Sequence, residues 1–428
     1  MGKDTLCFSK TAKFLFDEGQ VVAVNRFSGK WMRFSRECYE YLLKGIDAGL
    51  SADGFLECFM DENDKAYIQK LIDGLQRIGV VTDVAQRERE EEPYLESVQF
   101  SLTNRCNLQC KHCIASATGM AGEDPLSTDD IKAIIDKLVS CRVKTIILSG
   151  GEPLVRKDFL EILRYIKKAD KKIEISLMTN ALLITESNVR EIVDCVEDVD
   201  ISLDGYDEET CRRIRGKNVY GRVLKSIELL QKNGMSKIAL SMVSLGNDVE
   251  SDRKFNELCK RLNVTPMIRR LSYMGRAKEN EGYLRSLEKN TQLTEMAEIP
   301  AEKARSATKA CSCKAGIRVI NIDECGDIYP CNTFTACMKK IGNVIEIDSL
   351  YDFLKGRMNS TDDNEMSFFK FNPYYEEICK ECNLRYFCWT CPYATMDYLN
   401  ENADYSRYCE GMKAFLTPII WGEKYERV

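Results

Sequence analysis

Residues 97–113 read SVQFSLTNRCNLQCKHC. The first seven residues are an apolar run that predicts a β-strand. Three cysteines follow it, Cys106, Cys110 and Cys113, in a C-x3-C-x2-C spacing. Three thiols are an odd number for disulfide pairing and one fewer than a closed structural zinc site needs. The stretch therefore predicts a loop after a strand that presents three thiolates to a metal group with one position left open.

The same pattern of an apolar run followed by a helix-period stretch recurs through residue 271. The six apolar runs are SVQFSLT (97–103), KTIILSG (144–150), IEISLMTN (173–180), DVDISLD (198–204), KIALSMVSL (237–245) and TPMIRRL (265–271). Strands that alternate with helices form a parallel sheet with the helices packed outside it. Sites in such α/β folds lie at the carboxyl ends of the strands. Polar residues and glycines end these runs. Because such residues also form ordinary turns, any one of them alone is weak evidence for a functional site.

The composition excludes several classes of protein. The 428 residues are 44% hydrophobic and 30% charged, with a formal net charge of −6. Positive charges are interspersed with negative ones, so we expect no nucleic-acid partner. No apolar run is long enough to span a bilayer, so we expect no membrane association. The first ten residues, MGKDTLCFSK, lack the features of a secretory signal, and we therefore expect a cytoplasmic location.

Cysteine is unusually frequent, with 20 residues. In a reducing compartment disulfides are rare, so clustered cysteines indicate metal binding or catalysis. Seven are scattered and are interpreted as small buried hydrophobic residues; they are Cys7, Cys38, Cys58, Cys141, Cys195, Cys211 and Cys259. The others fall in two groups, within 106–113 and 311–409.

Residues 1–88 predict a small separate domain. GQVVAVNRFSGKWMRF (19–34) predicts a β-hairpin with Ser28 and Gly29 in its turn. A helix-period run capped by Ser35 follows, and a second amphipathic helix is expected at about 64–78, before Gly79. The charged stretch AQREREEEP then predicts a solvated linker.

The cysteine loop together with SGGEPL (149–154) resembles the radical S-adenosylmethionine (SAM) superfamily. His112 stands at the aromatic position of that family's C-x3-C-x-aromatic-C motif. The resemblance implies a partial (β/α)6 TIM barrel, here residues 95–300. It also implies a [4Fe–4S] cluster whose open iron binds SAM, which is cleaved to a 5′-deoxyadenosyl radical. A zinc site of three cysteines and His112 is the alternative for this loop.

The same resemblance implies a set of SAM-binding residues. Gly150, Gly151 and Glu152 match the motif that holds the methionine amino group, since a carboxylate suits an ammonium ion. Asn180, Ser202 and Arg215 stand where relatives place contacts to the ribose and carboxylate.

Residues 305–428 resemble the SPASM domain, a cysteine-rich extension that binds two auxiliary [4Fe–4S] clusters. The chain would then hold three clusters, with two zinc knuckles as the alternative. One gap, from Cys388 to Cys391, is a residue shorter than usual. The resemblance implies the distal ligands Cys379, Cys382, Cys388 and Cys409 and the proximal ligands Cys313, Cys331 and Cys391. For the fourth proximal position the candidates are Cys311, Cys325, Cys337 and a substrate thiolate.

No catalytic base can be assigned from the sequence. Sulfatase-maturing relatives carry an Asp directly after the cysteine that corresponds to Cys331. Here the residue is Asn332, which cannot take up a proton at neutral pH. This difference argues against a formylglycine-forming reaction.

The whole chain therefore resembles maturases of ribosomally made peptides. Residues 1–88 are similar to the winged-helix-like, PqqD-like element that binds the leader of a precursor peptide. The alternatives for these residues are a plain winged-helix domain and a DNA-binding one, and the acidic MDENDKAY (60–67) disfavours DNA binding. We expect Cys thioether crosslinks of the sactipeptide or ranthipeptide type, with flavodoxin or ferredoxin as reductant. The alternatives are a carbon–carbon crosslinking or decarboxylating maturase, a non-catalytic iron–sulfur electron-transfer or peptide-binding protein, and a zinc-binding adaptor.

Overall fold

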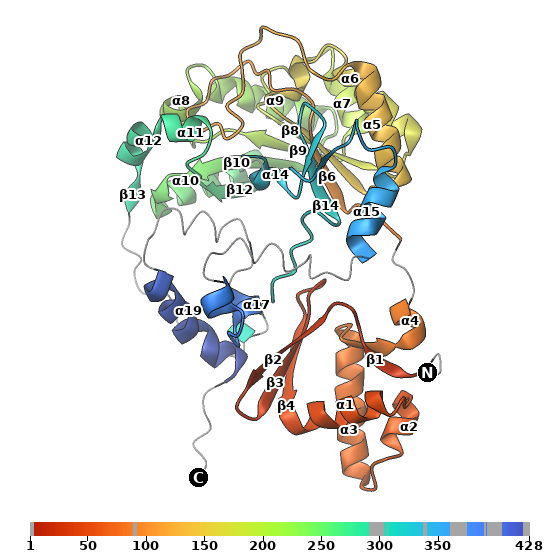
Figure 1. Ribbon diagram of the computed structural model, residues 1–428. Helices are drawn as coiled ribbons and strands as arrows, with labels where there is room; N and C mark the ends of the chain where they lie inside the picture. The colour runs from red at the N-terminus through yellow and green to blue at the C-terminus, as the bar shows by residue number, and fades with distance from the viewer. Residues whose placement is uncertain are drawn as a thin grey trace. The chain divides into compact units, whose positions relative to one another are not determined.

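The computed structural model describes residues 4–88, 92–290, 304–305, 307–336, 340–359, 375–388, 391 and 405–422 (Figure 1). The chain divides into two compact units. One contains residues 92–295 and 315–358, and the other contains residues 1–91, 296–314 and 359–428. Within the described residues, no helix has the length and apolarity that crossing a membrane requires.

Six parallel strands form the centre of the first unit, as the sequence predicted. They are β6 (Ser97–Ser101), β7 (Thr145–Ser149), β8 (Glu174–Thr179), β9 (Asp198–Ser202), β10 (Ile238–Ser244) and β12 (Thr265–Arg270). Their order in the sheet is β12-β10-β9-β8-β7-β6, so each strand pairs with the one that precedes it in this set. The carboxyl ends of all six therefore lie at one rim of the sheet.

Helices follow these strands and cover the outer face of the sheet (Figure 1). They are α5 (Thr128–Ser140), α6 (Phe159–Ala169), α7 (Val189–Cys195), α8 (Glu208–Arg215), α9 (Tyr220–Lys232) and α10 (Val249–Leu262). Capping boxes start α5 at Ser127 and α8 at Asp207, where side chains satisfy amide groups that the first turn leaves unpaired. Short elements complete this part: the 3-10 turn η1 (Pro153–Val155), α11 (Arg276–Glu279), α12 (Glu281–Leu287), and the pair β11 (Gly246–Asn247) and β13 (Lys289–Asn290).

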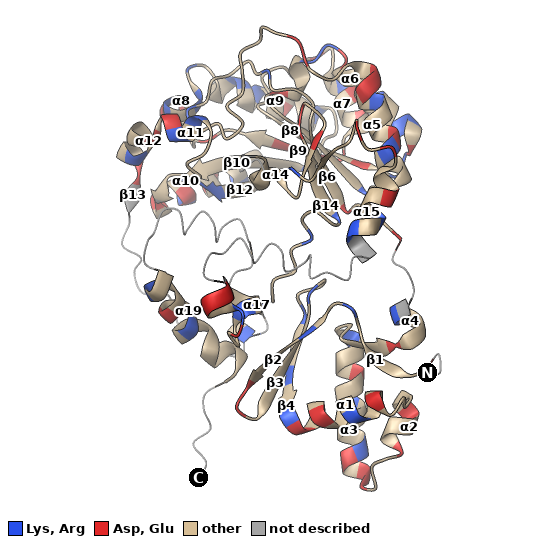
Figure 2. Cartoon of the chain, in the orientation of Figure 1, with Lys and Arg blue, Asp and Glu red and all other residues tan. Residues whose placement is uncertain are grey.

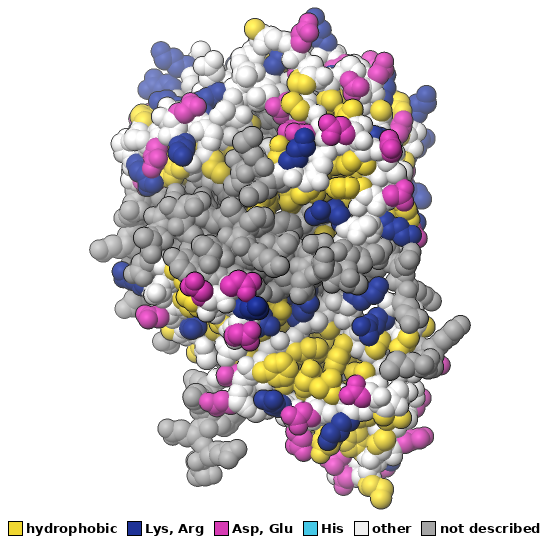
Figure 3. All heavy atoms as spheres, viewed as in Figure 1, with side chains coloured by type: hydrophobic (Ala, Val, Ile, Leu, Met, Phe, Trp, Pro, Cys, Tyr) yellow, Lys and Arg dark blue, Asp and Glu magenta, His cyan; other side chains and the backbone are white. Residues whose placement is uncertain are grey.

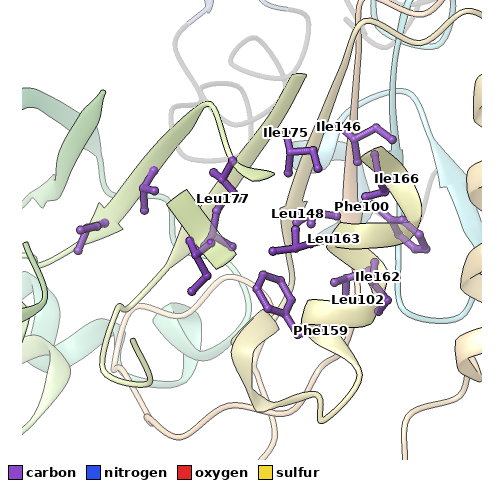
Figure 4. Packing of buried hydrophobic residues seen from close by; sticks show 14 of the residues in the cluster. Phe100, Leu102, Ile146, Leu148, Phe159, Ile162, Leu163, Ile166, Ile175 and Leu177 are labelled. Carbon is purple, nitrogen blue, oxygen red and sulfur yellow. The ribbon is translucent and has the colours of Figure 1, made fainter. Parts of the chain in front are cut away.

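The barrel core lies between the strands and their helices (Figure 4). Phe100 of β6 and Leu148 of β7 are at most 1% exposed, and Ile162 and Ile166 of α6 are fully buried against the same cluster. Burying one such side chain contributes about 1.5–3 kcal/mol. This packing fixes the strands, and through them the loops at the rim.

The sheet continues beyond β6 with residues from much later in the chain. The strand β14 (Val319–Ile322) pairs in parallel with β6, and β15 (Asp327–Tyr329) and β16 (Gly342–Asn343) extend the sheet antiparallel. The helices α14 (Asn332–Ala336) and α15 (Leu350–Asn359) accompany them. Residues 315–358 therefore fold with the barrel, whereas residues 305–428 were expected from sequence as one domain.

The predicted hairpin of residues 19–34 is confirmed as β3 (Gln20–Asn25) and β4 (Trp31–Ser35), with Gly29 at a φ of +68° in the turn. A third strand, β2 (Ala12–Asp17), pairs with β3 and was not predicted. Ser35 caps α1 (Arg36–Asp47) as expected. The second predicted helix is α3 (Glu62–Arg77), which begins slightly earlier than expected because Asp61 caps it. The remaining elements are β1 (Leu6–Phe8), α2 (Ala52–Leu56), β5 (Val81–Asp83) and α4 (Val84–Glu88).

The strand β3 is buried on both faces. Val21 and Ala23 belong to a core with the helices α1–α3, whereas Val22 and Val24 belong to a second core. That second core contains Leu384 and residues of α17 (Arg385–Cys388) and α19 (Tyr405–Ile420); the π-helical turn η3 (Tyr375–Cys379) precedes α17. The N-terminal sheet and the described cysteine-rich C-terminal elements thus share one hydrophobic core.

Positions of both charges are interspersed along the helices around the barrel, in the view of Figure 2. On the face shown in Figure 3, hydrophobic side chains gather over the part of the chain that contains β1–β4. Charge alone therefore does not mark a binding site.

Candidate active site

A cavity of about 500 Å³ opens at the carboxyl rim of the barrel strands. It is lined by the loop after β6, the loop after β7 and the ends of β8, β9, β10 and β12. Eight of the predicted site residues line it: Cys106, Cys110, Cys113, Gly150, Gly151, Asn180, Ser202 and Arg215. The structure therefore brings together residues that are up to 109 positions apart in the sequence (106 to 215).

Gly150 and Gly151 hold the cysteine loop by direct backbone contact. The amide N–H of Gly151 donates to the Thr103 carbonyl at 2.7 Å. A Cβ atom on Gly150 would lie 2.3 Å from the Thr103 carbonyl oxygen, and one on Gly151 would lie 2.3 Å from that of Arg105. Gly150 also has a φ of +129°. Glycine is therefore required here by close approach of the two loops.

Each thiol of the cysteine loop has an N–H donor directed at its sulfur. The Leu108 amide is 3.3 Å from Cys106 Sγ, the Ala117 amide is 3.5 Å from Cys113 Sγ, and Arg215 Nη1 is 3.7 Å from Cys110 Sγ. Donors of this kind stabilise thiolates and tune a bound cluster. These three N–H donors are therefore compatible with three cysteine thiolates that bind a metal group.

Burial opposes ionisation of two thiols of the loop, those of Cys106 and Cys110. It raises the pKa of Cys106 to about 11, while the Leu108 amide acts in the opposite direction. It also raises the pKa of Cys110, against the effect of the Arg215 guanidinium. A thiol coordinates a metal as the thiolate, so binding a metal group here must release protons.

The arrangement does not resemble a ready site for one metal ion. In the described part of the chain, no group of three or more His, Cys, Asp or Glu side chains is arranged to hold an ion. A [4Fe–4S] cube is larger than an ion, so its thiolates stand further apart. His112 Nε2 lies 2.8 Å from Asp204 Oδ2. Its other ring nitrogen, Nδ1, is buried and has no hydrogen-bond partner among the described residues, so the alternative Cys3His zinc site stays a prediction.

Glu152 is 1% exposed and does not line the cavity. Its carboxylate accepts hydrogen bonds from Thr179 Oγ1 at 2.7 Å, the Asn180 amide at 2.7 Å and the Leu154 amide at 3.3 Å. Burial raises its pKa, and these donors act against that rise. In this structure Glu152 braces the end of β8; its contact to the methionine amino group remains a prediction.

The three other predicted SAM contacts have distinct surroundings. Asn180 Nδ2 donates to Asn107 Oδ1 at 2.7 Å, which links the end of β8 to the cysteine loop. Ser202 lines the cavity at the end of β9. Arg215 is committed to Asp204, with Arg215 Nε 2.6 Å from Asp204 Oδ2. These positions are compatible with the predicted contacts to the ribose and carboxylate, which stay predictions.

Asp204 is a site residue that the sequence indicated only as one of the polar residues at the strand ends, without a role. Its buried carboxylate accepts from Arg215, from His112 and from the Val243 amide at 2.7 Å. Burial raises its pKa, but Arg215 and His112 outweigh this and the pKa lies well below its usual range. Its φ of +56° places it in a tight turn after β9. The available signal was its position at a strand end, which Asp shares with ordinary turn residues.

The distal cysteines lie together in the unit that contains the N-terminal sheet. Cys379, Cys382 and Cys388 pack against its second core. Burial raises the pKa of Cys388 to about 12, and the nearby thiols of Cys379, Cys409 and Cys382 add to the rise. The four predicted ligands are thus near neighbours, and their binding of a cluster remains a prediction.

The proximal cysteines are divided between the two units. Cys313 and Cys391 belong to one unit and Cys331 to the other. Of the candidates for the fourth position, Cys311 is buried and Cys325 is exposed. Cys337 lies outside the described residues. Asn332, at the position of the missing Asp, lines the cavity.

Residues 100–262 match the profile of the Radical SAM superfamily. The chain is 31% identical over 252 residues to "Mycofactocin maturase MftC" of Mycolicibacterium smegmatis. That alignment covers 54% of this chain and 63% of the relative, so it spans less than two thirds of the relative's length.

Two solved structures share the architecture. SuiB of Streptococcus suis bound to S-adenosylmethionine has a TM-score of 0.51 at 17% identity, over 89% of this chain and 94% of that one. The enzyme anSMEcpe with bound AdoMet and Cp18Cys peptide has a TM-score of 0.52 at 17% identity, over 77% of this chain and 98% of that one. The partial barrel therefore has the radical SAM fold, as the cysteine motif implied.

Gly151→Ala should move the cysteine loop away from the SAM side of the cavity. We expect SAM affinity, measured by isothermal titration of the reconstituted protein, to fall roughly tenfold or more, the equivalent of about 1.4 kcal/mol. Gly221→Ala is the matched control, because a Cβ there meets nothing within 4 Å. Equal SAM affinity in the two variants would contradict the role assigned to the close approach.

Asp204→Asn should destabilise the protein by about 3 kcal/mol at pH 7, because it leaves the buried Arg215 guanidinium without its charge partner. The folded-state pKa of Asp204 is lowered, so its stabilising effect is present above its ordinary value of about 4 and is lost as pH falls below it. Urea unfolding should therefore separate the variant from wild type at pH 7 and less so near pH 3. Asp194→Asn, which removes an exposed ion pair with Arg190, should cost less than about 1 kcal/mol.

Proposed function

We propose that this protein is a radical SAM enzyme that modifies a ribosomally synthesised precursor peptide. One observation carries the proposal: a single cavity is lined by the three cysteines of the loop after β6, by Gly150 and Gly151 (the glycine cradle), and by polar residues such as Asn321, Asn332 and Thr333 (the polar wall). The thiols and the cradle suit a cluster and SAM, and the polar wall leaves room for a further substrate.

The residues of the cysteine loop and of the glycine pair after β7 would hold the cofactors. Cys106, Cys110 and Cys113 would ligate the [4Fe–4S] cluster, and Gly150 and Gly151 would admit the methionine end of SAM. When bound, these groups supply a 5′-deoxyadenosyl radical that can abstract a hydrogen atom. The chain's own contribution is to keep the three sulfurs in place through directed N–H donors and to bury Cys106 and Cys110 from water.

The opposite wall of the cavity is suited to a peptide. It is formed by the end of β14 and by residues before and within α14, with Asn321, Asn332 and Thr333 among its side chains. Amide and hydroxyl groups can both donate to and accept from a peptide backbone. The similarity to a maturase, and to an enzyme solved with a peptide, supports a peptide as the substrate class.

The leader of the precursor would bind the N-terminal sheet. Since β2 pairs with one side of β3, the free edge of the hairpin β3–β4 is at β4, where no strand of the described residues is paired. The helix α3 lies against this strand, because a Cβ on Gly74 would be 2.8 Å from Met32 Sδ. An added peptide strand along β4 would gain backbone hydrogen bonds and contacts with α3.

The reaction we propose is the formation of thioether crosslinks, from Cys sulfur to a carbon of another residue of the peptide. Forming one C–S bond removes one hydrogen from carbon and one from sulfur. The radical takes up one electron in the hydrogen atom abstracted from carbon, the hydrogen on sulfur leaves as a proton to solvent, and an auxiliary cluster would accept the remaining electron. Ferredoxin or flavodoxin would serve as the external reductant that starts the reaction. Asn332 in place of Asp supports a reaction other than formylglycine formation.

Metal analysis after anaerobic reconstitution tests the cofactor assignment. Three [4Fe–4S] clusters predict about twelve iron atoms per chain, falling by about four when Cys106, Cys110 and Cys113 are replaced together by Ala. Cys58→Ala, which removes an exposed cysteine of the N-terminal part, should leave the iron content unchanged. A few zinc atoms and little iron per chain would contradict the enzyme assignment and favour a zinc-binding adaptor.

Mass spectrometry of the reacted precursor peptide tests the chemistry. Each thioether should lower the peptide mass by about 2 Da and make one thiol resistant to alkylation. A loss of about 2 Da with every thiol still reactive would favour a carbon–carbon crosslink, and a larger loss would favour decarboxylation. If SAM and a strong reductant yield no 5′-deoxyadenosine, the protein is not a radical SAM enzyme in function.

A further inference from the structure

The cysteine loop is fastened by a segment more than 160 residues later in the sequence, directly after β12. The amide N–H of Arg276 donates to the Cys113 carbonyl at 2.9 Å. Its guanidinium donates through Nη1 to the Cys110 carbonyl at 3.1 Å and through Nη2 to the Ala117 carbonyl. One residue thus pairs with three carbonyls spread over the loop.

The preceding residue shows how closely the two segments approach. Gly275 has a φ of +54°, and a Cβ on it would lie 2.1 Å from the Ile114 carbonyl oxygen. Asn280 adds a further bond, from Nδ2 to the Lys111 carbonyl at 3.3 Å. The start of α11 is therefore in backbone contact with the loop that carries the three cysteines.

Arg276 differs from Arg215 in the balance of charge around it. Arg215 also reaches Cys110, but its charge is offset by the Asp204 carboxylate at 2.6 Å. Among the described residues, no carboxylate lies within ion-pair distance of Arg276. Within the described part of the chain, its positive charge therefore acts on the loop and on the Cys110 thiol without a carboxylate at ion-pair distance.

We propose that Arg276 is a positioning residue that holds the cysteine loop in its ligating shape and raises the reduction potential of the cluster bound there. This inference rests on the proposed function, because it assumes a cluster at Cys106, Cys110 and Cys113. An uncompensated positive charge beside the sulfurs favours the more negative, reduced state of the cluster. The two effects can be tested separately, because lysine keeps the positive charge but lacks the forked guanidinium group that contacts two carbonyls.

Three variants test the proposal: Arg276→Ala removes the charge and the guanidinium contacts, Arg276→Lys keeps the charge, and Lys278→Ala is the control. Lys278 is an exposed residue of the same helix, so its loss removes one charge without touching the loop. Amide hydrogen exchange of peptides covering residues 106–118 is measured on cluster-free protein. The reduction potential of the cluster is then measured by EPR-monitored titration without SAM.

In Arg276→Ala, we expect exchange in residues 106–118 to become roughly tenfold faster or more, because buried carbonyls lose a charged donor. We expect the potential to shift to more negative values. Arg276→Lys should show part of the faster exchange but a potential close to that of wild type, and Lys278→Ala should match wild type in both.

Two results would overturn the proposal. The first is equal loop exchange in Arg276→Ala and Lys278→Ala. The second is a reduction potential in Arg276→Lys that falls as far as in Arg276→Ala. That result would show that the positive charge of residue 276 does not set the potential. Because exchange is read on cluster-free protein, a wild-type protein that takes up no iron would refute the proposed function while the exchange data still decide whether Arg276 holds the loop.

Discussion

The backbone contact between the loops after β6 and β7 is the constraint on which the rest of the site depends. The Gly151 amide reaches the Thr103 carbonyl at 2.7 Å, and the Glu152 amide reaches that of Arg105 at 2.9 Å. These bonds lie just beyond the last paired residues of the two strands, Ser101 and Ser149. They place three cysteines beside a glycine cradle, and no side chain fits between the two backbones. Thiolate site and cofactor cavity are thus consequences of one strand pairing.

Charge around the cysteine loop is balanced in two different ways. Asp204 neutralises Arg215 and also accepts from His112, so it ties the loop to the ends of β9 and β10 with little net charge. In the described structure, the Arg276 guanidinium pairs only with carbonyl groups, so no carboxylate neutralises its positive charge there. If the site holds the proposed cluster, such asymmetry would favour its reduction, because the buried thiolates alone would disfavour it.

The unit outside the barrel is built around β3. Because its side chains alternate between two faces, Val21 and Ala23 serve the helical core, and Val22 and Val24 serve the core shared with α17 and α19. Arg26 donates to the Cys311 carbonyl, and Trp31 Nε1 donates to the Thr308 carbonyl at 2.8 Å. The sheet proposed to bind a leader peptide and the cysteines proposed to bind the distal cluster are therefore stabilised together.

The sequence by itself determined the features that depend on local order. Apolar runs located six barrel strands, Ser35 and Gly29 located a helix cap and a turn, and the spacing of three cysteines indicated the site. Only the tertiary structure decided the pairing of β14 with β6, the inward orientation of Glu152 and the roles of Asp204 and Arg276. Each of these rests on contacts between residues 11 to more than 200 positions apart, or on which way a side chain turns. Hydrophobic periodicity and motif spacing do not specify such long-range contacts or side-chain orientations, because these follow from how the completed strands and helices pack.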